Sequence, residues 1–246
     1  MITAIERSPQ FYARLGGILY LAIIVFGIFG ELFVRGALVV SGDAPATAAA
    51  ISASPFLWRA GVAGDLLMHV LDVPVILILY LLLRPVSEGL ALLATLFNLV
   101  QTAVLAANKL NLLVPVFLLD NAAYLKAFSP EQLQALSYLA INAHGHGFGI
   151  GLIFFGFACL VRGYLIFSSG YFPRILGLLM LAAGLGYLVN SFALLLAPSL
   201  AAAIFPAILV PAFIGELFFC LWLIVKGVDL GQWEQRVGSW RARAAH

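Results

Sequence analysis

The chain has 246 residues, of which 63% are hydrophobic and only 10% are charged. A soluble domain carries about 25% charged residues, so this chain has too little polar surface to coat a water-soluble fold. Its formal net charge of +2 is too small for nucleic-acid binding by a basic face. Its two cysteines lie in separate apolar runs, which excludes a disulfide framework. The composition indicates an integral membrane protein.

Six apolar stretches reach the roughly 20 residues that a membrane-spanning helix needs. They cover residues 11–34, 55–83, 88–113, 136–161, 173–196 and 204–225. Ser129 and Gln132 have the spacing of a capping box, which predicts a short helix that leads into the fourth span. Asp43 and Pro45 predict another short helix in the first loop. The sequence therefore predicts an all-α fold, a polytopic membrane bundle with six transmembrane helices.

The distribution of lysine and arginine predicts the orientation of the chain. One side of the membrane holds nine of them, namely Arg7, Arg14, Arg84, Arg162, Arg174, Lys226, Arg236, Arg241 and Arg243. The other side holds Arg35, Arg59 and Lys126, with Lys109 near the end of the third span. We therefore expect both termini to be cytoplasmic.

The last residues differ in character from the spans. Leu230, Trp233, Val237 and Trp240 recur at helical spacing and are accompanied by arginines. Such a helix can lie in the lipid headgroup layer, with tryptophan towards the acyl chains and arginine near anionic lipid. We expect residues 1–228 to form the transmembrane domain and residues 229–246 an amphipathic cytoplasmic tail at the membrane surface.

Many polar side chains fall inside the predicted spans, where an ionisable group costs about 2.5–3.5 kcal/mol. The candidate intramembrane site consists of Glu31, Asp65, His69, Asp72, Asn98, Gln101, Asn108, Lys109, Asn142, His144, His146, Asn190 and Glu216. Given the predicted orientation, these side chains fall in the outer and middle parts of the spans. The sequence predicts one polar site open to the outer side.

The second span carries the sharpest pattern. Asp65, His69 and Asp72 recur at i, i+4 and i+7, so they project from one helix face. Asn98 and Gln101, with Thr102, follow one face of the third span and can hydrogen-bond to these carboxylates, with Lys109 as a counter-charge. Such a face can hold a proton, orient a catalytic base or bind a metal.

No cofactor is predicted, but a divalent metal stays an alternative. Its weak candidate ligands are His69, Asp65, His144 and Glu216. His144 and His146 lie two residues apart, so on a helix they point about 200° apart and cannot serve one metal. The sequence contains no P-loop, dinucleotide-binding glycine pattern, nucleophile elbow or zinc-protease motif.

Several stretches resemble a known family. They are Gly42-Asp43 with the Ala/Thr-rich segment after it, residues 79–86, 154–156, 163–166 and 169–177, Gly215-Glu216, Trp222-Leu223 and Lys226-Gly227. Together they resemble an uncharacterised bacterial integral-membrane family, domain of unknown function forty-three eighty-six. The resemblance implies a multi-helix protein of the bacterial inner membrane and supplies no activity, substrate or catalytic residue. A remoter likeness is to seven-helix intramembrane hydrolases, although this chain lacks one span and their paired histidines.

Three functions remain open at this point. The leading hypothesis is binding or transport of a small polar or amphiphilic molecule, coupled to a proton on the face of Asp65, His69 and Asp72. The alternative is an intramembrane enzyme, metal-dependent or not, that acts on a lipid-like substrate with His69 as base or ligand. The third is an accessory subunit whose polar residues only hold helices together. The expected partners are membrane lipids, an unidentified small molecule and, because no inverted repeat is evident, a second copy of the chain.

Overall fold

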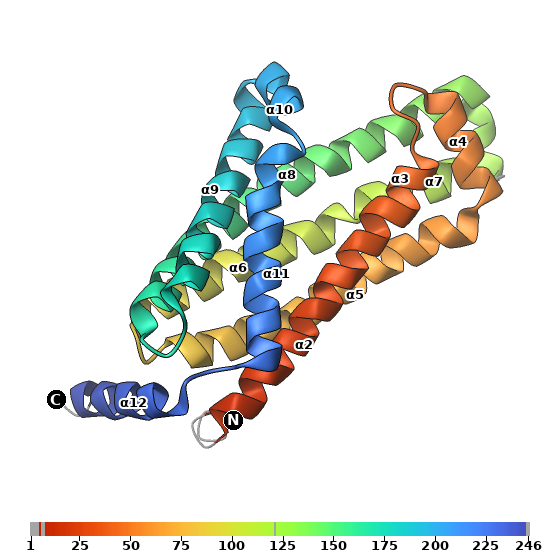
Figure 1. Ribbon diagram of the computed structural model, residues 1–246. Coiled ribbons are helices and arrows are strands. Elements are labelled where there is room, and N and C mark those ends of the chain that lie inside the picture. The colour runs from red at the N-terminus through yellow and green to blue at the C-terminus, as the bar shows by residue number, and fades with distance from the viewer. Residues whose placement is uncertain (1–4, 6–7, 121, 245–246) are drawn as a thin grey trace. The chain divides into compact units, whose positions relative to one another are not determined.

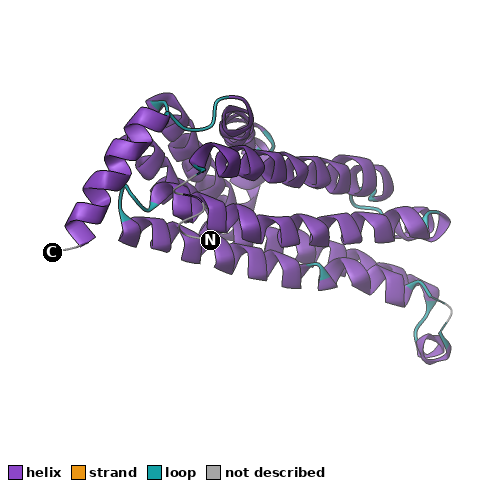
Figure 2. Cartoon of the chain, turned by 90° about the horizontal axis from the view of Figure 1, so that it is seen from below, coloured by secondary structure: helices purple, strands orange, loops and turns teal. Residues whose placement is uncertain are grey.

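The computed structural model describes residues 5, 8–120 and 122–244 as helices and connecting loops (Figure 1). In chain order the elements are α2 (Pro9–Ile28), the π-helix η1 (Phe29–Arg35), α3 (Gly36–Leu38), α4 (Ala44–Ala53), α5 (Pro55–Leu83), α6 (Glu88–Asn108), α7 (Leu110–Leu118), the 3-10 helix η2 (Ala123–Ala127), α8 (Pro130–Ser169), α9 (Arg174–Leu196), α10 (Pro198–Ile204), the 3-10 helix η3 (Ala207–Leu209), α11 (Val210–Val225) and α12 (Leu230–Ala244). Figure 2 shows no strand among these residues.

Within the described chain, 6 helical runs are long and apolar enough to cross a membrane. They are Pro9–Leu38, Pro55–Leu83, Glu88–Leu118, Pro130–Ser169, Arg174–Leu196 and Ala207–Val225. The predicted all-α fold with six membrane-spanning helices is therefore confirmed. Arg7 and His246 lie outside the described residues, and the cytoplasmic placement of the termini stays a prediction.

The start of the fourth span differs from the prediction. The backbone N–H of Ser129 donates to Oε1 of Gln132 at 2.8 Å, and the N–H of Gln132 donates to Oγ of Ser129 at 3.3 Å, as the capping box requires. However, the separate short helix is wrong, because α8 runs without a break from Pro130 to Ser169. The helix has no proline after its first residue, so nothing in its backbone ends it early.

The same helix contains Arg162, which the sequence placed in a cytoplasmic loop. That placement is wrong, because Arg162 lies inside α8 and is only 3% exposed. The residues after it are mostly apolar and continue the helix to Ser169. Burial of the guanidinium is tolerated because Nη2 of Arg162 donates to Oδ1 of Asn98 at 2.5 Å.

The chain forms two compact units, which we describe separately. Unit 1 consists of Met1–Ala22, Leu71–Thr102 and Gly149–His246, and unit 2 of Ile23–Val70 and Ala103–Phe148. In unit 1, α9 packs beside α11 (Figure 1) and also beside α10.

Glycines bring α8 and α9 of unit 1 into backbone contact. A Cβ on Gly163 would lie 2.9 Å from the carbonyl oxygen of Gly177, and a Cβ on Gly177 would lie 2.7 Å from the carbonyl oxygen of Gly163. Gly156 and Gly184 show the same reciprocity, at 3.1 and 2.8 Å. The two pairs are about two helical turns apart, so small residues set the spacing of these helices over a long contact.

Helix α12 belongs to unit 1 and packs against the rest of that unit through its tryptophans. Trp233 is 1% exposed, and its ring meets that of Tyr171 edge to face at a centroid distance of 5.2 Å. The guanidinium of Arg84 lies 4.7 Å from the centroid of the Trp240 ring. The tail is helical, but protein rather than lipid covers Trp233. Its position at the membrane surface stays a prediction.

The apolar core of unit 2 surrounds Trp58. This side chain is buried with Ile51, Val62 and Leu112, and its Nε1–H donates to the carbonyl oxygen of Leu112 at 2.8 Å. The short helix expected in the first loop is present as α4, and the N–H of Ala46 donates to Oδ1 of the cap residue Asp43 at 2.8 Å. This core holds the ends of α5 and α7 in place beside the polar residues of the unit.

Candidate functional site

The polar residues of unit 2 form a charged cluster around Asp65. Its carboxylate lies in α5 and is 1% exposed. One oxygen, Oδ2, accepts from Nη1 of Arg35 at 2.7 Å and from Nζ of Lys109 at 2.9 Å. Two cations therefore share one buried carboxylate oxygen, which binds three segments of the chain together.

Arg35 reaches Asp65 from a π-helical segment, η1. On this segment Nε of Arg35 also donates to Oε2 of Glu31 at 2.8 Å. Glu31 is the accessible member of the group, with a side chain that is 66% exposed. π-Helical turns are rare and occur mostly at functional sites, where they change the direction of side chains. Here the turn brings an acidic and a basic side chain to the same edge of the cluster.

Lys109 enters the cluster at an interruption between α6 and α7. The N–H of Lys109 donates to the carbonyl oxygen of Ala106 at 3.2 Å, which is the tighter bonding of a turn rather than of an α-helix. Pro115 lies in α7 and has no N–H to donate, so the third span is irregular over this region. The side chain of Lys109 is only 2% exposed despite its charge.

His144 of α8 completes the buried part of the cluster. Its Nε2 lies 3.2 Å from Nζ of Lys109. An ammonium group can only donate, so this contact requires Nε2 of His144 to accept and Nδ1 to carry the proton. Asn108 donates to the backbone oxygen of His144 at 2.8 Å. A Cβ on Gly147 would collide with the Asn108 amide, so glycine is needed there.

Two buried polar atoms of α5 have no hydrogen-bond partner among the described residues. They are Oδ1 of Asp65 and Nε2 of His69. Oδ1 of Asp65 faces Gly30 of η1, where a Cβ would collide with it. Buried polar atoms without partners are uncommon and mark positions where a water or a ligand binds. The cluster therefore has unused hydrogen-bonding capacity on the helix face that the sequence predicted.

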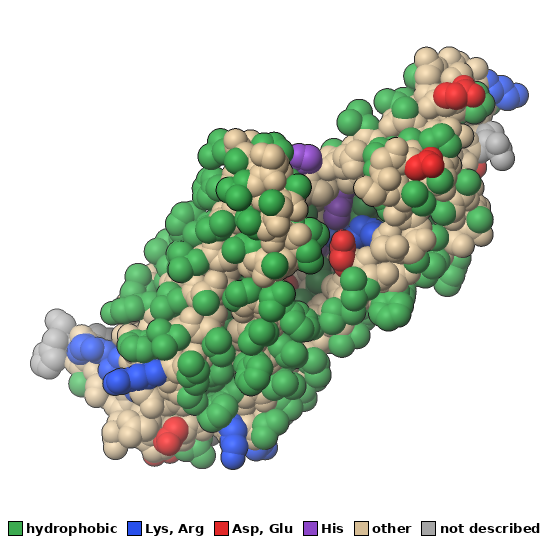
Figure 3. All heavy atoms as spheres, turned by 45° about the horizontal axis from the view of Figure 1, so that its top comes forward, with side chains coloured by type: hydrophobic (Ala, Val, Ile, Leu, Met, Phe, Trp, Pro, Cys, Tyr) green, Lys and Arg blue, Asp and Glu red, His purple; other side chains and the backbone are tan. Residues whose placement is uncertain are grey.

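The remaining predicted residues of unit 2 lie outside the buried cluster. Asn142 and His146 are exposed on α8, and Nδ1 of His146 lies 3.1 Å from the backbone oxygen of Asn142. His144 is buried and His146 is not, as expected for two residues that point apart on a helix. On the face drawn in Figure 3, acidic, basic and histidine side chains gather at one place within a largely apolar surface.

The other predicted residues belong to unit 1. Asp72 accepts from Nδ2 of Asn98 at 3.1 Å and from the hydroxyl of Thr102, so the expected pairing of the second and third spans is present. Nδ2 of Asn98 also donates to Oε1 of Gln101 at 2.8 Å.

Glu216 has different partners in unit 1, the hydroxyls of Tyr20 (2.6 Å) and Tyr187. Asn190 is buried in α9. The predicted site residues thus belong to two units, and within each unit they bind one another or neighbouring side chains.

The sequence reasoning missed four residues that bind the predicted ones: Arg35, Arg162, Tyr20 and Tyr187. Arg35 follows Glu31 at i+4, and this spacing could have been recognised as a helical ion pair. Arg162 is followed by further apolar residues, a sign that the span continues past it. Nothing in the local sequence signals the roles of the two tyrosines, since their partner Glu216 is distant in the chain.

A metal centre gains no support from this geometry. Within residues 5, 8–120 and 122–244, no group of three histidine, cysteine, aspartate or glutamate side chains could hold a metal ion. Of the four weak candidates, His69, Asp65 and His144 lie in unit 2 and Glu216 lies in unit 1.

The comparison with known families agrees with the resemblance seen in the sequence. The family described as "Domain of unknown function (DUF4386)" matches residues 15–227. The chain belongs to this family. A similar protein from Archaeoglobus fulgidus, described as "Uncharacterized protein", is 29% identical over 171 residues, which cover 70% of this chain and 86% of that protein. No solved structure matches the chain.

Proposed function

We propose that this membrane protein binds a small amphiphilic molecule with an anionic headgroup at the Asp65 cluster of unit 2, where the headgroup competes with Asp65 for Arg35 and Lys109. The observation that carries the proposal is the sharing of one buried carboxylate oxygen by Arg35 and Lys109. An anionic headgroup that displaces Asp65 from one of these cations, or a substitution that removes the Asp65 charge, makes that positive charge available to the ligand. The charged and titratable groups around Asp65 are Arg35, Lys109, His69 and His144, and Glu31 pairs with Arg35.

The arrangement favours binding over a purely structural role. Apolar residues of similar volume hold helices together as well as a buried ion pair does, or better. Polar contacts between membrane helices contribute only about 0.6 kcal/mol each. In this cluster, the charges coincide with a π-helical turn and a helix interruption, which are features of ligand sites in membrane proteins.

The test uses purified protein in a neutral detergent, with decanoate, decylamine and decanol as probes. A ligand that binds the folded state raises the melting temperature in proportion to its affinity. We expect decanoate to stabilise the protein at neutral pH, and the other two probes, one cationic and one uncharged, to have little effect. The variant Asp65→Asn removes the competing carboxylate charge and should bind decanoate more tightly than the wild type.

Two lysine variants provide the matched comparison. Lys109→Met should abolish stabilisation by decanoate, whereas Lys126→Met, at an exposed position, should retain it. Equal stabilisation by decylamine, or no gain of decanoate binding in Asp65→Asn, would contradict the proposal. A gain of binding in Asp65→Asn is an informative result, because a misfolded variant does not gain affinity.

Transport is the next step of the same proposal. Proteoliposomes that contain a pH-sensitive dye should acidify inside when decanoate is added outside, and more slowly with the Lys109→Met protein. The uncatalysed flip of protonated decanoate is measured in empty liposomes. Equal rates with and without protein would restrict the function to binding.

One observation favours an enzyme as the second candidate. Nε2 of His69 is buried, has no partner among the described residues and lies one helical turn from Asp65. A neutral imidazole beside a carboxylate is suited to act as a general base on a lipid-like substrate. Incubation of the protein with phospholipid vesicles, followed by mass spectrometry of the lipids, should reveal a product that the His69→Ala variant does not form.

We further propose that both termini lie on the cytoplasmic side of the cell membrane. Ser239 is exposed on α12, and both native cysteines, Cys159 and Cys220, are buried. A Ser239→Cys variant should therefore react with a membrane-impermeant maleimide in broken cells but not in intact ones. Reaction in intact cells would show instead that the C-terminal helix faces the outside of the cell.

A further inference from the structure

A second polar network lies inside unit 1. It contains two carboxylates, Asp72 of α5 and Glu216 of α11. Asp72 accepts from Asn98 at 3.1 Å and from Thr102, while Glu216 accepts from Tyr20 at 2.6 Å and from Tyr187. The side chains of the network therefore belong to several of the membrane-spanning helices of the unit.

Arg162 is the one cation, among the described residues of this network, that attracts both carboxylates. Its guanidinium interacts electrostatically with Asp72 and with Glu216. Its Nη2 donates to Oδ1 of Asn98 at 2.5 Å, and Nδ2 of the same amide donates to Asp72. Asn98 therefore connects the arginine with one carboxylate through its own two polar atoms.

The charges of this network do not balance unless it holds a proton. Two ionised carboxylates and one guanidinium would leave one uncompensated negative charge inside a membrane span, which costs several kcal/mol. The other titratable groups that face the pair are Tyr20, Cys159 and Tyr187, all neutral at physiological pH, so they supply no second cation. Uptake of one proton makes the network neutral.

We propose that Asp72 and Glu216 together bind one exchangeable proton at neutral pH, with Arg162 as the counter-ion of the carboxylate that stays ionised. The two carboxyl groups interact through a common cation, so the proton belongs to the pair rather than to one residue. Each carboxyl retains hydrogen-bond partners when protonated, because the hydroxyls of Thr102, Tyr20 and Tyr187 can accept as well as donate.

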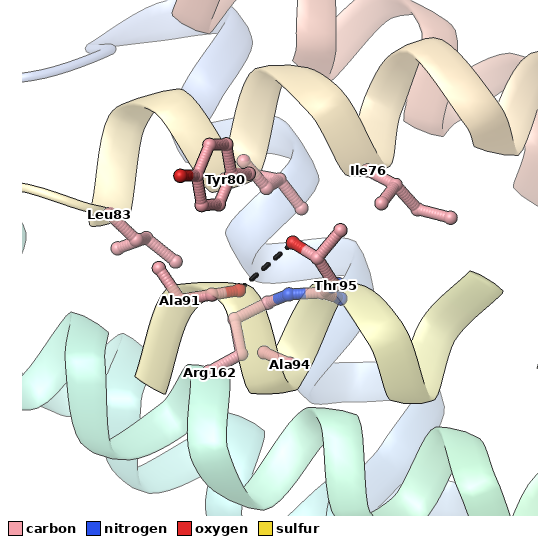
Figure 4. A pocket seen from close by; sticks show the side chains of 8 residues that line it. Ile76, Tyr80, Leu83, Ala91, Ala94, Thr95 and Arg162 are labelled. Atoms are coloured by element: carbon pink, nitrogen blue, oxygen red, sulfur yellow. Dashed lines mark hydrogen bonds between the residues drawn. The ribbon is translucent and has the colours of Figure 1, made fainter. Parts of the chain in front are cut away.

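There is room for a water molecule beside the arginine of this network. A pocket lined by Ile76, Tyr80, Leu83, Ala91, Thr95 and Arg162 has room for about one water molecule (Figure 4). In the pocket, the hydroxyl of Thr95 is already bonded to the backbone oxygen of Ala91 at 2.9 Å. A water molecule in this pocket would therefore find its donor in the Arg162 side chain.

Infrared spectroscopy of the reconstituted full-length protein tests this proposal without any substrate. A protonated carboxyl group has a carbonyl stretch above the amide I band, which shifts in deuterated buffer. We expect the wild-type protein to show this band in neutral buffer. In Asp72→Asn and in Glu216→Gln, the one remaining carboxylate is balanced by Arg162 and becomes ionised, so either change alone should remove the band. Glu31→Gln, at an exposed carboxylate of unit 2, should leave it unchanged.

The arginine variant gives the opposite result if the charge argument is correct. Without its cation, the network should bind a second proton, so the band of Arg162→Gln should be about twice that of the wild type. Absence of the band in the wild-type protein, or its persistence in either single carboxyl variant, would overturn the proposal. If Arg162→Gln fails to fold, the Asp72→Asn and Glu216→Gln spectra still decide the question.

Discussion

The contact between α8 and α9 allows a quantitative test of how this bundle holds its polar residues. A Cβ added at Gly163 would lie 2.8 Å from the backbone nitrogen of Leu181 and 2.9 Å from the backbone oxygen of Gly177. Because both atoms belong to the backbone, no rotamer change can relieve the contact. We predict that Gly163→Ala separates the two helices by about half an ångström and costs about 1–3 kcal/mol, the usual cost of overpacking.

Helix propensity acts in the other direction and must be separated from this effect. Alanine is favoured over glycine inside a helix by up to about 1 kcal/mol. Gly145 provides the control, since it lies in the same helix and a Cβ there would have no atom within 4 Å. Gly145→Ala should therefore be neutral or slightly stabilising. The difference between the two variants then measures the packing cost alone.

The assay is reversible unfolding in mixed micelles with increasing dodecyl sulfate, followed by tryptophan fluorescence. Gly163→Ala should unfold at a lower dodecyl sulfate fraction than Gly145→Ala, and Gly163→Ala combined with Gly156→Ala at a lower fraction still. Arg162 precedes Gly163, so the infrared band of the unit 1 network should also shift. If Gly163→Ala is no less stable than Gly145→Ala, the close approach of these helices does not exist in the membrane.

Three further predictions concern the charged cluster and the end of unit 1. Lys109→Met leaves the charge of Asp65 less compensated and should destabilise the protein by about 3–5 kcal/mol in the same unfolding assay, whereas Lys126→Met should have almost no effect. Gly30→Ala places a Cβ against the carboxylate of Asp65 and should abolish decanoate stabilisation, whereas Gly64→Ala, where the nearest atom would be 3.5 Å away, should not. Burial raises the pKa of Tyr171, whose hydroxyl donates to the backbone oxygen of Leu82 at 2.5 Å. The folded state therefore holds the hydroxyl proton of Tyr171 more tightly than the unfolded state does. The contribution of this hydroxyl to the free energy of unfolding is fully present below about pH 10 and decreases as the pH rises further. Tyr171→Phe should be about 1 kcal/mol less stable at neutral pH and should lose less stability in alkaline buffer; an unchanged alkaline loss would count against this account.

The sequence was sufficient to predict the architecture because lipid imposes simple rules. A spanning segment must be apolar and about 20 residues long, and its backbone must be hydrogen-bonded within itself. The second span therefore coincides with α5, from Pro55 to Leu83. The predictions failed where a polar residue was taken as the end of a span, as at Arg162. A buried arginine is compatible with a span only if a partner such as Asn98 is close, and the partner is invisible in the local sequence.

The composition of the candidate site was also predictable in part. Charged residues are rare in this chain, and each one inside a span needs a partner, which is why Asp65 and Lys109 could be chosen in advance. Their grouping was not predictable, because Asp65 and Asp72 share a helix face yet bind different sets of residues. A helix repeat specifies only the direction in which side chains project. Their partners come from segments distant in the chain.

The sequence by itself thus determined that the protein is an all-helical membrane protein and which of its residues are costly to bury. Only the tertiary structure decided that these residues form one cluster around Asp65 and another around Arg162. The physical reason is that apolarity and helical period are local properties of the chain. Charge compensation depends on distances between helices, which the backbone contacts of glycines such as Gly163 and Gly177 establish.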